Sequence, residues 1–82
     1  MTETADTERL VKYVVTSLVA FPDEVVVERK DQEGTIVYEV TVNQADVGKV
    51  IGRQGRMIKA LRMLARAAAS TDEQQVDVEV LG

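Results

Sequence analysis

Two segments in which apolar and polar residues alternate strictly constrain the fold of this chain more than any other feature. In TIVYEVTV (residues 35–42) one side carries Ile36, Tyr38, Val40 and Val42, and the other carries Val37, Glu39 and Thr41. In Gln75–Leu81 the inward side carries Val76, Val78 and Val80, and the outward side carries Asp77 and Glu79. A period of two is typical of a β-strand that buries one face. Both segments are therefore predicted to be strands.

A further strand is predicted immediately before the first of these. EVVVERK (Glu24–Lys30) is rich in β-branched valine and is followed by the turn-forming segment Asp31–Gly34. Two strand segments joined by a short loop that contains glycine predict an antiparallel hairpin.

The first of three predicted helices runs from Thr7 to Phe21. Asp6 or Thr7 can cap its start, and Pro22 ends it because the residue before a proline is pushed out of the helical region. Its main apolar stripe has helical spacing, with two further valines beside it. The stripe consists of Leu10, Val14, Leu18 and Phe21, and the valines are Val11 and Val15.

Two more helical segments lie between the second and third strands. Asn43 is a good N-cap for a short helix that ends at Gly52, with Val47, Val50 and Ile51 as its apolar face. A longer helix is predicted after Gly55, running to about Ser70. Its apolar side carries Ile58, Leu61, Leu64, Ala65 and Ala68, and another side carries Lys59, Arg62 and Arg66. The order of elements is thus helix, strand, strand, helix, helix, strand, an α+β arrangement.

Composition excludes several classes of function. The chain has 82 residues, which is enough for one small domain, and 45% of them are hydrophobic and 29% charged. It contains no cysteine and no histidine, so the commonest nucleophile, general base and transition-metal ligands are missing. An enzyme, a metal site and a cofactor are therefore not expected. No segment approaches a membrane span, and the N-terminus lacks the features of a signal peptide, so a cytoplasmic location is predicted.

The net charge of -4 conceals an uneven distribution. Residues 47–71 contain six basic residues and no acid, whereas all 14 acidic residues lie elsewhere, together with only four bases. This separation predicts one face that attracts an anionic partner on a body that repels it.

The basic segment is interrupted by Gly52 and Gly55, and two interpretations of these glycines are open. They can simply end one helix and begin the next, as a C-cap and a loop residue. Alternatively they allow close approach of a sugar-phosphate backbone, next to Arg53 and Gln54 and to the positive end of the following helix dipole. The spacing Gly-x-x-Gly is by itself a weak signal.

The segment VIGRQGRMIKALR resembles the signature of the KH domain, I-G-x-x-G-x-x-I followed by an apolar residue three positions on. The matching residues are Ile51, Gly52, Arg53, Gln54, Gly55, Ile58 and Leu61. The element order resembles the type II KH fold, which implies a three-stranded mixed sheet with three helices packed on one face. Chain length, the FPDE segment and VGKVIGRQGR resemble the small bacterial single-KH proteins of the KhpA type. The resemblance covers roughly Glu8 to Leu81, with residues 1–6 expected as a flexible N-terminus and 7–82 as a single KH domain.

The resemblance implies binding of single-stranded RNA, because the GxxG loop of KH domains clamps the backbone of about four nucleotides and an adjoining apolar groove holds the bases. Spacing leaves open whether Val47, Val50, Ile51 and Ile58 face RNA or the core, and the core is favoured for each. Lys59, Arg62 and Arg66 form either a solvated face or a further electrostatic contact. The expected RNA-binding residues are Lys49, Ile51, Gly52, Arg53, Gln54, Gly55, Arg56, Ile58, Lys59 and Arg62.

The expected function is therefore RNA binding, as an RNA chaperone or post-transcriptional regulator. Family members form homodimers and pair with a larger KH protein of the KhpB type, so both are expected partners. The acidic body and the absence of aromatic residues near the loop predict low affinity and low sequence specificity. An alternative is a dimerisation module with a KH fold whose partner supplies most of the RNA contact. A helix-turn-helix DNA binder and a P-loop enzyme fit the sequence poorly.

Overall fold

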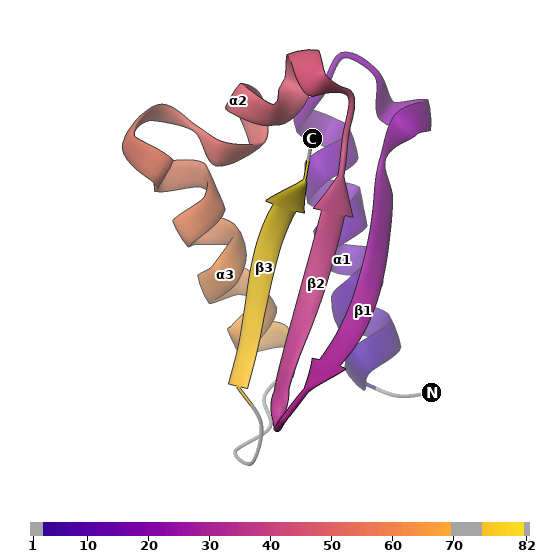
Figure 1. Cartoon of the computed structure of the whole chain (residues 1–82), viewed down its shortest axis with the longest axis vertical. Helices are drawn as coiled ribbons and strands as arrows, with labels where there is room; N and C mark the ends of the chain where they lie inside the picture. Colours follow the sequence, from indigo (N-terminus) through magenta and orange to yellow (C-terminus); the bar gives the residue numbers. More distant parts are fainter. Residues whose placement is uncertain (1–2, 70–74, 82) are drawn as a thin grey trace.

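The computed structural model of the chain describes residues 3–69 and 75–81, and its element order confirms the α-β-β-α-α-β prediction (Figure 1). The order also contains three short 3-10 turns, η1, η2 and η3. In chain order the elements are α1 (Glu3–Leu18), η1 (Pro22–Glu24), β1 (Val26–Gln32), β2 (Thr35–Thr41), η2 (Gln44–Asp46), α2 (Val47–Ile51), η3 (Arg53–Gly55), α3 (Arg56–Ala69) and β3 (Gln75–Leu81).

The sheet is mixed, as predicted, with β2 between the other two strands. Strand β1 pairs with β2 antiparallel, from Val26 opposite Thr41 to Gln32 opposite Thr35. Strand β3 pairs with β2 in parallel, from Gln75 opposite Thr35 to Leu81 opposite Thr41. One edge of the sheet is therefore β1, and the other edge is β3.

The hairpin between β1 and β2 is tighter than the sequence predicted. Its turn consists only of Glu33 and Gly34, both with positive φ (49° and 87°), the type I′ turn that matches the twist of paired strands. The predicted strand end at Lys30 and the predicted turn over residues 31–34 are therefore wrong. The strand continues to Gln32 because a two-residue turn leaves Asp31 and Gln32 free to pair with β2.

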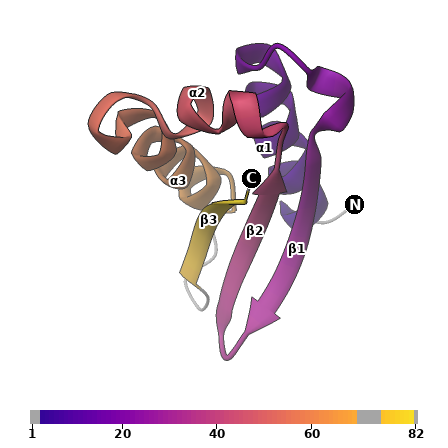
Figure 2. The same ribbon diagram turned by 45° about the horizontal axis from the view of Figure 1, so that its top comes forward.

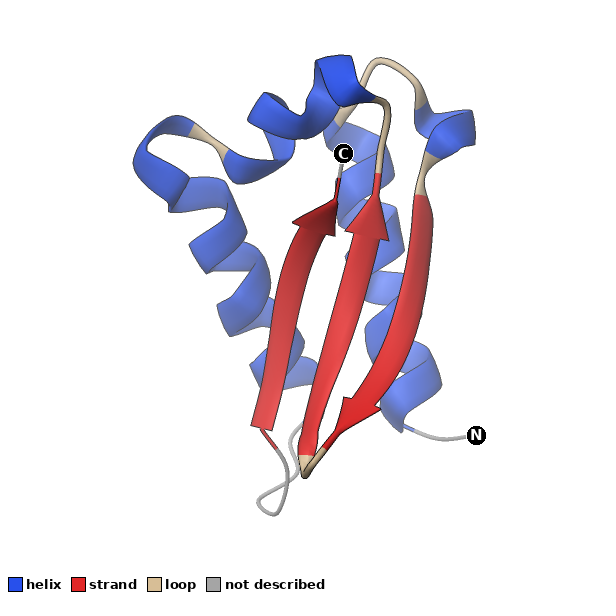
Figure 3. Cartoon of the chain, viewed as in Figure 1, coloured by secondary structure: helices blue, strands red, loops and turns tan. Residues whose placement is uncertain are grey.

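Helices α1 and α3 cover one face of the sheet, and α2 lies across its upper end (Figures 1 and 3). The opposite face carries no helix within the described part of the chain. The inward sides of β2 and β3 were predicted correctly. The buried core consists of Val11, Val15, Val25, Val27, Ile36, Tyr38, Val40, Val42, Val50, Ile58, Leu61, Ala65, Val76 and Val78, with Val80 partly buried against it.

Helix α1 has different bounds from those predicted, and neither Asp6 nor Thr7 caps it, since both lie inside the helix. Thr7 is fully buried and its side chain hydrogen-bonds with Tyr38, the largest buried residue of the sheet. Burial raises the pKa of the Tyr38 phenol, so the phenol stays neutral at physiological pH. The prediction that residues 1–6 are flexible stays a prediction.

The helix also ends earlier than predicted, at Leu18, four residues before Pro22. The backbone N–H groups of Ala20 and Phe21 donate to the carboxylate of Asp46 instead of continuing the helical ladder. Proline is therefore not what ends the helix.

The side of α1 that faces the core is centred on other residues than those predicted. Val11 and Val15 are fully buried, whereas Phe21, predicted in the main stripe, is 46% exposed. The rest of that stripe (Leu10, Val14 and Leu18) is only partly buried at the edge of the core.

Helices α2 and α3 agree more closely with prediction. Asn43 caps the turn η2, which leads directly into α2, and its side chain accepts a hydrogen bond from Ala45 N–H. Helix α3 is described as far as Ala69, and its predicted end at Ser70 lies outside the described residues. Leu64, predicted on the buried side of α3, is 38% exposed. Val37 lies on the open face of the sheet as its position in the alternation requires, yet it is buried. No helix in the described part of the chain is long and apolar enough to cross a membrane.

Candidate nucleic-acid interface

The loop between α2 and α3 projects beside the free edge of β3, at the end of the molecule opposite the β1–β2 turn (Figures 1 and 2). Helix α2 closes with a hydrogen bond from Gly52 N–H to Gly48 C=O at 2.8 Å, and Gly55 N–H then donates to Gly52 C=O at 3.1 Å. Helix α3 begins directly afterwards at Arg56, so the positive end of its dipole lies at the loop.

The two loop glycines are required for different physical reasons. Gly52 has φ 79° and ψ 171°, a conformation that only glycine adopts readily. A Cβ atom on Gly52 would also lie 2.7 Å from Met57 Cβ and 2.8 Å from Met57 N, which is far inside contact distance. Gly55 has φ 73°, but a Cβ there would meet Ile58 only at 3.8 Å, an ordinary contact. The positive φ thus explains why both positions are glycine. At Gly52, the close packing against Met57 of α3 is a second and independent reason.

Arg53 and Gln54 form the exposed tip of the loop. Gln54 adopts a left-handed conformation, with φ 58° and ψ 25°, which turns the chain between the two glycines. Its side-chain oxygen accepts a hydrogen bond of 3.4 Å from an Nη atom of Arg56. Both residues therefore project from the loop where sequence analysis placed them.

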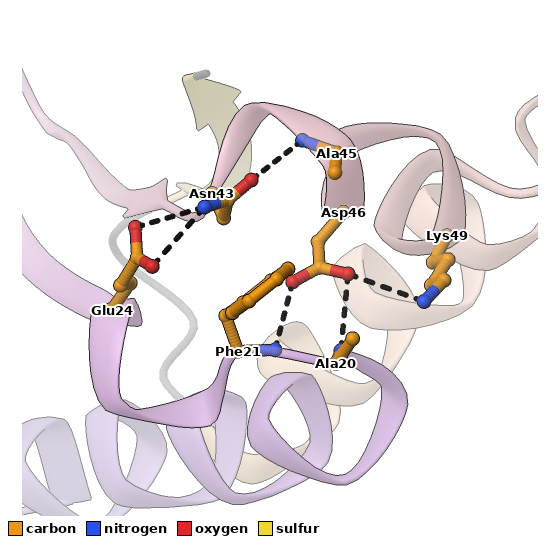
Figure 4. A network of polar contacts seen from close by, with 7 residues as sticks. All are labelled: Ala20, Phe21, Glu24, Asn43, Ala45, Asp46 and Lys49. Atoms are coloured by element: carbon orange, nitrogen blue, oxygen red, sulfur yellow. Dashed lines mark hydrogen bonds and ion pairs between the residues drawn. The ribbon is translucent and has the colours of Figure 1, made fainter.

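A buried carboxylate fixes the start of α2 (Figure 4). The side chain of Asp46 is fully buried and accepts hydrogen bonds from the backbone N–H groups of Ala20 and Phe21, at 3.0 and 3.1 Å. It also pairs with Lys49 Nζ at 3.3 Å. Several contacts hold the pKa of Asp46 below its ordinary value, and the hydrogen bond from Ala20 N–H has the largest effect. Asp46 therefore joins the α1–β1 connection to the helix that carries the loop.

A second carboxylate-amide contact supports the same corner of the molecule. The side-chain amide of Asn43 donates to both carboxylate oxygens of Glu24, at 3.1 Å each (Figure 4). The FPDE segment thus contacts the N-cap of the α2 region.

A groove of about 330 Å³ runs from the loop side of α2 and α3 across the end of β3. Most of its lining is apolar, and two of the apolar side chains are substantially exposed, Ile51 at 38% and Leu81 at 43%. Two charged residues also contribute. The lining consists of Ile51, Ile58, Arg62, Glu79, Val80 and Leu81. Such a surface can accept a flat apolar face and offers hydrogen-bonding groups at its rim.

The four apolar residues left open by the sequence divide between groove and core. Val50 is fully buried in the core, and Val47 packs partly against it. Ile51 is exposed and lines the groove, while Ile58 is buried and lines the groove from behind. The preference for the core at all four positions is therefore wrong for Ile51, because α2 is only five residues long and ends at the edge of the core.

The basic residues differ in whether an acidic partner holds them. Lys49 pairs with Asp46, and Arg62 Nε contacts Asp77 Oδ1 at 2.8 Å. Arg53, Arg56 and Lys59 form no ion pair with the side chains of residues 7–68 or 75–81, and Arg66 forms none there either. Arg66 is held by a backbone carbonyl of β3, so the positive charge of residues 47–66 that has neither an ion pair nor a backbone hydrogen bond in this part of the structure lies at the loop and the first turn of α3.

Arg62 and Arg66 have a structural contact that the sequence did not reveal. Their Nε atoms donate to the carbonyl oxygens of Val78 (3.2 Å) and Val76 (2.9 Å), respectively. These carbonyls belong to β3, the edge strand next to α3. The two arginines thus satisfy backbone groups of an unpaired sheet edge, a role that requires knowledge of where β3 lies.

Sequence analysis missed two carboxylates of this region. Asp46 and Glu79 were read as part of the acidic body, and Glu79 as an outward residue of the third strand. The buried role of Asp46 had no signal in the sequence, since an aspartate just before a helix is ordinarily an exposed cap. The position of Glu79 in the groove follows only from the placement of β3 beside α2 and α3.

Comparison with known proteins gives consistent results. The family model described as the KhpA/KhpB KH domain matches residues 8–80. The chain is 44% identical over 69 residues to RNA-binding protein KhpA of Chlamydia trachomatis, covering 84% of this chain and 88% of that protein. It is 42% identical over 74 residues to RNA-binding protein KhpA of Clostridium acetobutylicum, with 90% and 99% covered, and 40% identical over 74 residues to that of Thermotoga maritima, with 90% and 97% covered.

Among solved structures, the fold is similar to part of Aquifex aeolicus Era, with a TM-score of 0.62 at 19% sequence identity. The similarity covers 92% of this chain but only 30% of the Era chain. At this identity the likeness concerns the fold alone.

Proposed function

The chain belongs to the KhpA/KhpB KH-domain family, and from this premise we propose that it binds short single-stranded RNA segments by clamping their backbone with the loop Gly52–Gly55. Membership of a family of RNA-binding proteins supports RNA binding, and it makes the chain a binding protein and not an enzyme. Family membership does not identify the residues that contact RNA, and the role of the loop as the clamp is our proposal.

One observation carries this proposal. Arg53, Arg56 and Lys59 form no ion pair with the side chains of residues 7–68 or 75–81, and they lie on the loop and the first turn of α3, close in the chain to the groove residues Ile51 and Ile58. Phosphates would contact these cations and the positive end of α3, while bases would lie in the groove. Lys49 adds positive charge at the same end, with its position set by Asp46.

The test is fluorescence anisotropy of a labelled single-stranded RNA of about 12 nucleotides, at two salt concentrations. The variant Arg53→Asp/Gln54→Asp places two negative charges at the loop tip, and aspartate tolerates the left-handed conformation of Gln54. We expect the wild type to bind and this variant to lose binding. Circular dichroism verifies that the fold is intact.

The matched control is Lys12→Asp/Gln32→Asp, which makes the same change of net charge at two exposed residues on α1 and at the end of β1. We expect it to retain most of the affinity. If both variants bind as well as the wild type, the loop is not the clamp. If both lose binding equally, net charge and not the loop determines affinity.

In the cell we propose a role as an RNA chaperone or post-transcriptional regulator in the cytoplasm, acting as a homodimer or with a larger KH protein of the KhpB type. Two weakly binding sites held together gain affinity through their raised effective concentration. Sedimentation equilibrium that shows only monomer at tens of micromolar would contradict the homodimer.

The second candidate function is a dimerisation module whose partner supplies most of the RNA contact. Exposed apolar side chains on α3 favour it, since Met63 is 65% exposed and Leu64 lies beside it on the same helix. Absence of RNA binding by the isolated wild type, together with self-association in sedimentation, would make this the better description.

A further inference from the structure

The groove next to the loop contains a carboxylate, which is unexpected in a site that receives a polyanion. Glu79 lines the groove, and its side chain forms no hydrogen bond or ion pair with residues 7–68 or 75–81. Arg62, the other charged residue of the lining, is paired with Asp77 instead. A carboxylate in this position repels phosphates, whereas a base that enters the groove can replace the water around it with hydrogen-bond donors of its own.

Arg62 supplies the opposite kind of group to the same groove. Its Nε atom is committed to Asp77 Oδ1 and to the carbonyl oxygen of Val78. Both contacts use this single nitrogen, so they fix the plane of the guanidinium while its two terminal nitrogens remain available within the described part of the chain. The terminal nitrogens are donors in a fixed fork.

The groove therefore offers an acceptor pair from Glu79 and a donor fork from Arg62 above an apolar floor. Guanine has the complementary groups. Its N1–H and N2 amino groups are adjacent donors that a carboxylate can accept in a bidentate manner, and its O6 and N7 atoms are adjacent acceptors that suit an arginine. Adenine and cytosine each present one amino group, and uracil presents carbonyl oxygens on both sides of N3–H, where they would oppose Glu79.

We propose that this groove selects guanine among the four RNA bases, with Glu79 as the residue that determines the selectivity. The inference rests on the proposed RNA-binding function and deepens it. It also replaces the expectation of low sequence specificity, which was drawn from the absence of aromatic residues near the loop and took no account of charged residues in the groove.

The expected effect follows from the strength of bidentate base contacts. One good bidentate pair discriminates against a wrong base by roughly 5- to 150-fold. Because Glu79 is exposed, we expect a value at the lower end, about tenfold in favour of guanine over uracil.

The experiment measures anisotropy with labelled hexanucleotides that contain one variable base among uridines: guanosine, adenosine, cytidine, uridine or inosine. Inosine lacks the N2 amino group of guanine but keeps N1–H, so it removes one of the two donors to Glu79. The wild type should bind the guanosine oligonucleotide best and the inosine oligonucleotide several times more weakly. In Glu79→Gln the difference between guanosine and inosine should fall below about twofold, because the amide offers one acceptor instead of two.

The control variant is Glu28→Gln. Glu28, Glu39 and Glu79 lie opposite one another in the sheet register, so Glu28 belongs to the same row of carboxylates but on the far strand. This control removes the same charge outside the groove and should leave the ranking of bases unchanged.

The possible outcomes separate the inference from the function on which it rests. Equal binding of guanosine and uridine by the wild type, with loss of both in Arg53→Asp/Gln54→Asp, overturns the inference and leaves the proposed function standing. Equal effects of Glu79→Gln and Glu28→Gln on the guanosine-to-inosine ratio would show that overall charge is responsible, which also overturns the inference. If the wild type binds none of the oligonucleotides, both proposals fall.

Discussion

The glycines of the chain provide a direct test of which constraints the fold itself imposes on the loop. We compare single alanine substitutions at Gly48, Gly52 and Gly55. Gly48 lies in α2, where nothing within 4 Å would meet a Cβ atom, so alanine there should stabilise the helix by about 0.5–1 kcal/mol. Gly55 requires a positive φ but leaves room for a methyl group, so its alanine variant should lose roughly 1 kcal/mol.

Gly52 combines both penalties. Its φ of 79° with ψ of 171° costs a non-glycine residue about 1–3 kcal/mol, and the collision of Cβ with the backbone of Met57 adds an overpacking cost of about 1–3 kcal/mol. The sum is about 2–6 kcal/mol. An 82-residue domain has a total stability of about 4–12 kcal/mol, so Gly52→Ala should remove about a sixth of it or more.

Urea unfolding followed by circular dichroism measures these differences. With a slope near 1 kcal/mol per molar for a small domain, the midpoint of Gly52→Ala should fall by roughly 2 M or more, whereas that of Gly48→Ala should rise by about 0.5–1 M. The expected order of stability is Gly48→Ala, wild type, Gly55→Ala, Gly52→Ala. A Gly52→Ala protein within about 0.5 kcal/mol of the wild type, or more stable than Gly55→Ala, would refute the argument from Met57.

Two further predictions concern charge. Asp46→Asn should lower the urea midpoint at pH 7, because one amide oxygen replaces two carboxylate oxygens that accept from backbone N–H groups. The lowered pKa of Asp46 means that its stabilisation is present above the unfolded value near 3.9 and is lost as the pH falls through the folded value. The gap between the variant and the wild type should therefore narrow below about pH 4, and a gap independent of pH would contradict this. If Arg53, Arg56 and Lys59 each contact one phosphate, the logarithm of RNA affinity should fall with the logarithm of salt with a slope of roughly -2, and Arg56→Gln should reduce that slope by about 0.7, as measured by anisotropy titrations. An unchanged slope would remove Arg56 from the interface.

Patterns that depend on a residue and its neighbours in the chain were read correctly from the sequence. The alternation in residues 35–42 and Gln75–Leu81 gave the buried sides of β2 and β3, and Asn43 caps the α2 region as expected. The loop from Gly52 to Gly55 lies between two helices as predicted. Each of these features is decided by local geometry, by the period of a strand or by the conformations that glycine and asparagine allow.

Features decided by contacts between distant segments were not predicted. The end of α1 depends on Asp46, which lies 26 residues beyond Ala20 and competes for its backbone N–H group. The side of α1 that faces the core depends on where Tyr38 lies, because Thr7 of this helix hydrogen-bonds with Tyr38. Arg62 donates to the carbonyl oxygen of Val78, which lies 16 residues further along the chain in β3. In each case a polar side chain is matched to a group that sequence spacing does not bring near it.

The conformation of Gly52 and its contact with Met57 require glycine whether or not RNA binds, so the Gly-x-x-Gly pattern alone does not distinguish a helix junction from an RNA clamp. Gly48 is different, because the folded chain leaves open space around it and a helix would be more stable with alanine. If the RNA backbone passes along α2, a side chain at this position should obstruct it. RNA affinity that falls in Gly48→Ala while stability rises would therefore point to close approach by a ligand, and unchanged affinity would place the RNA path on the α3 side of the loop.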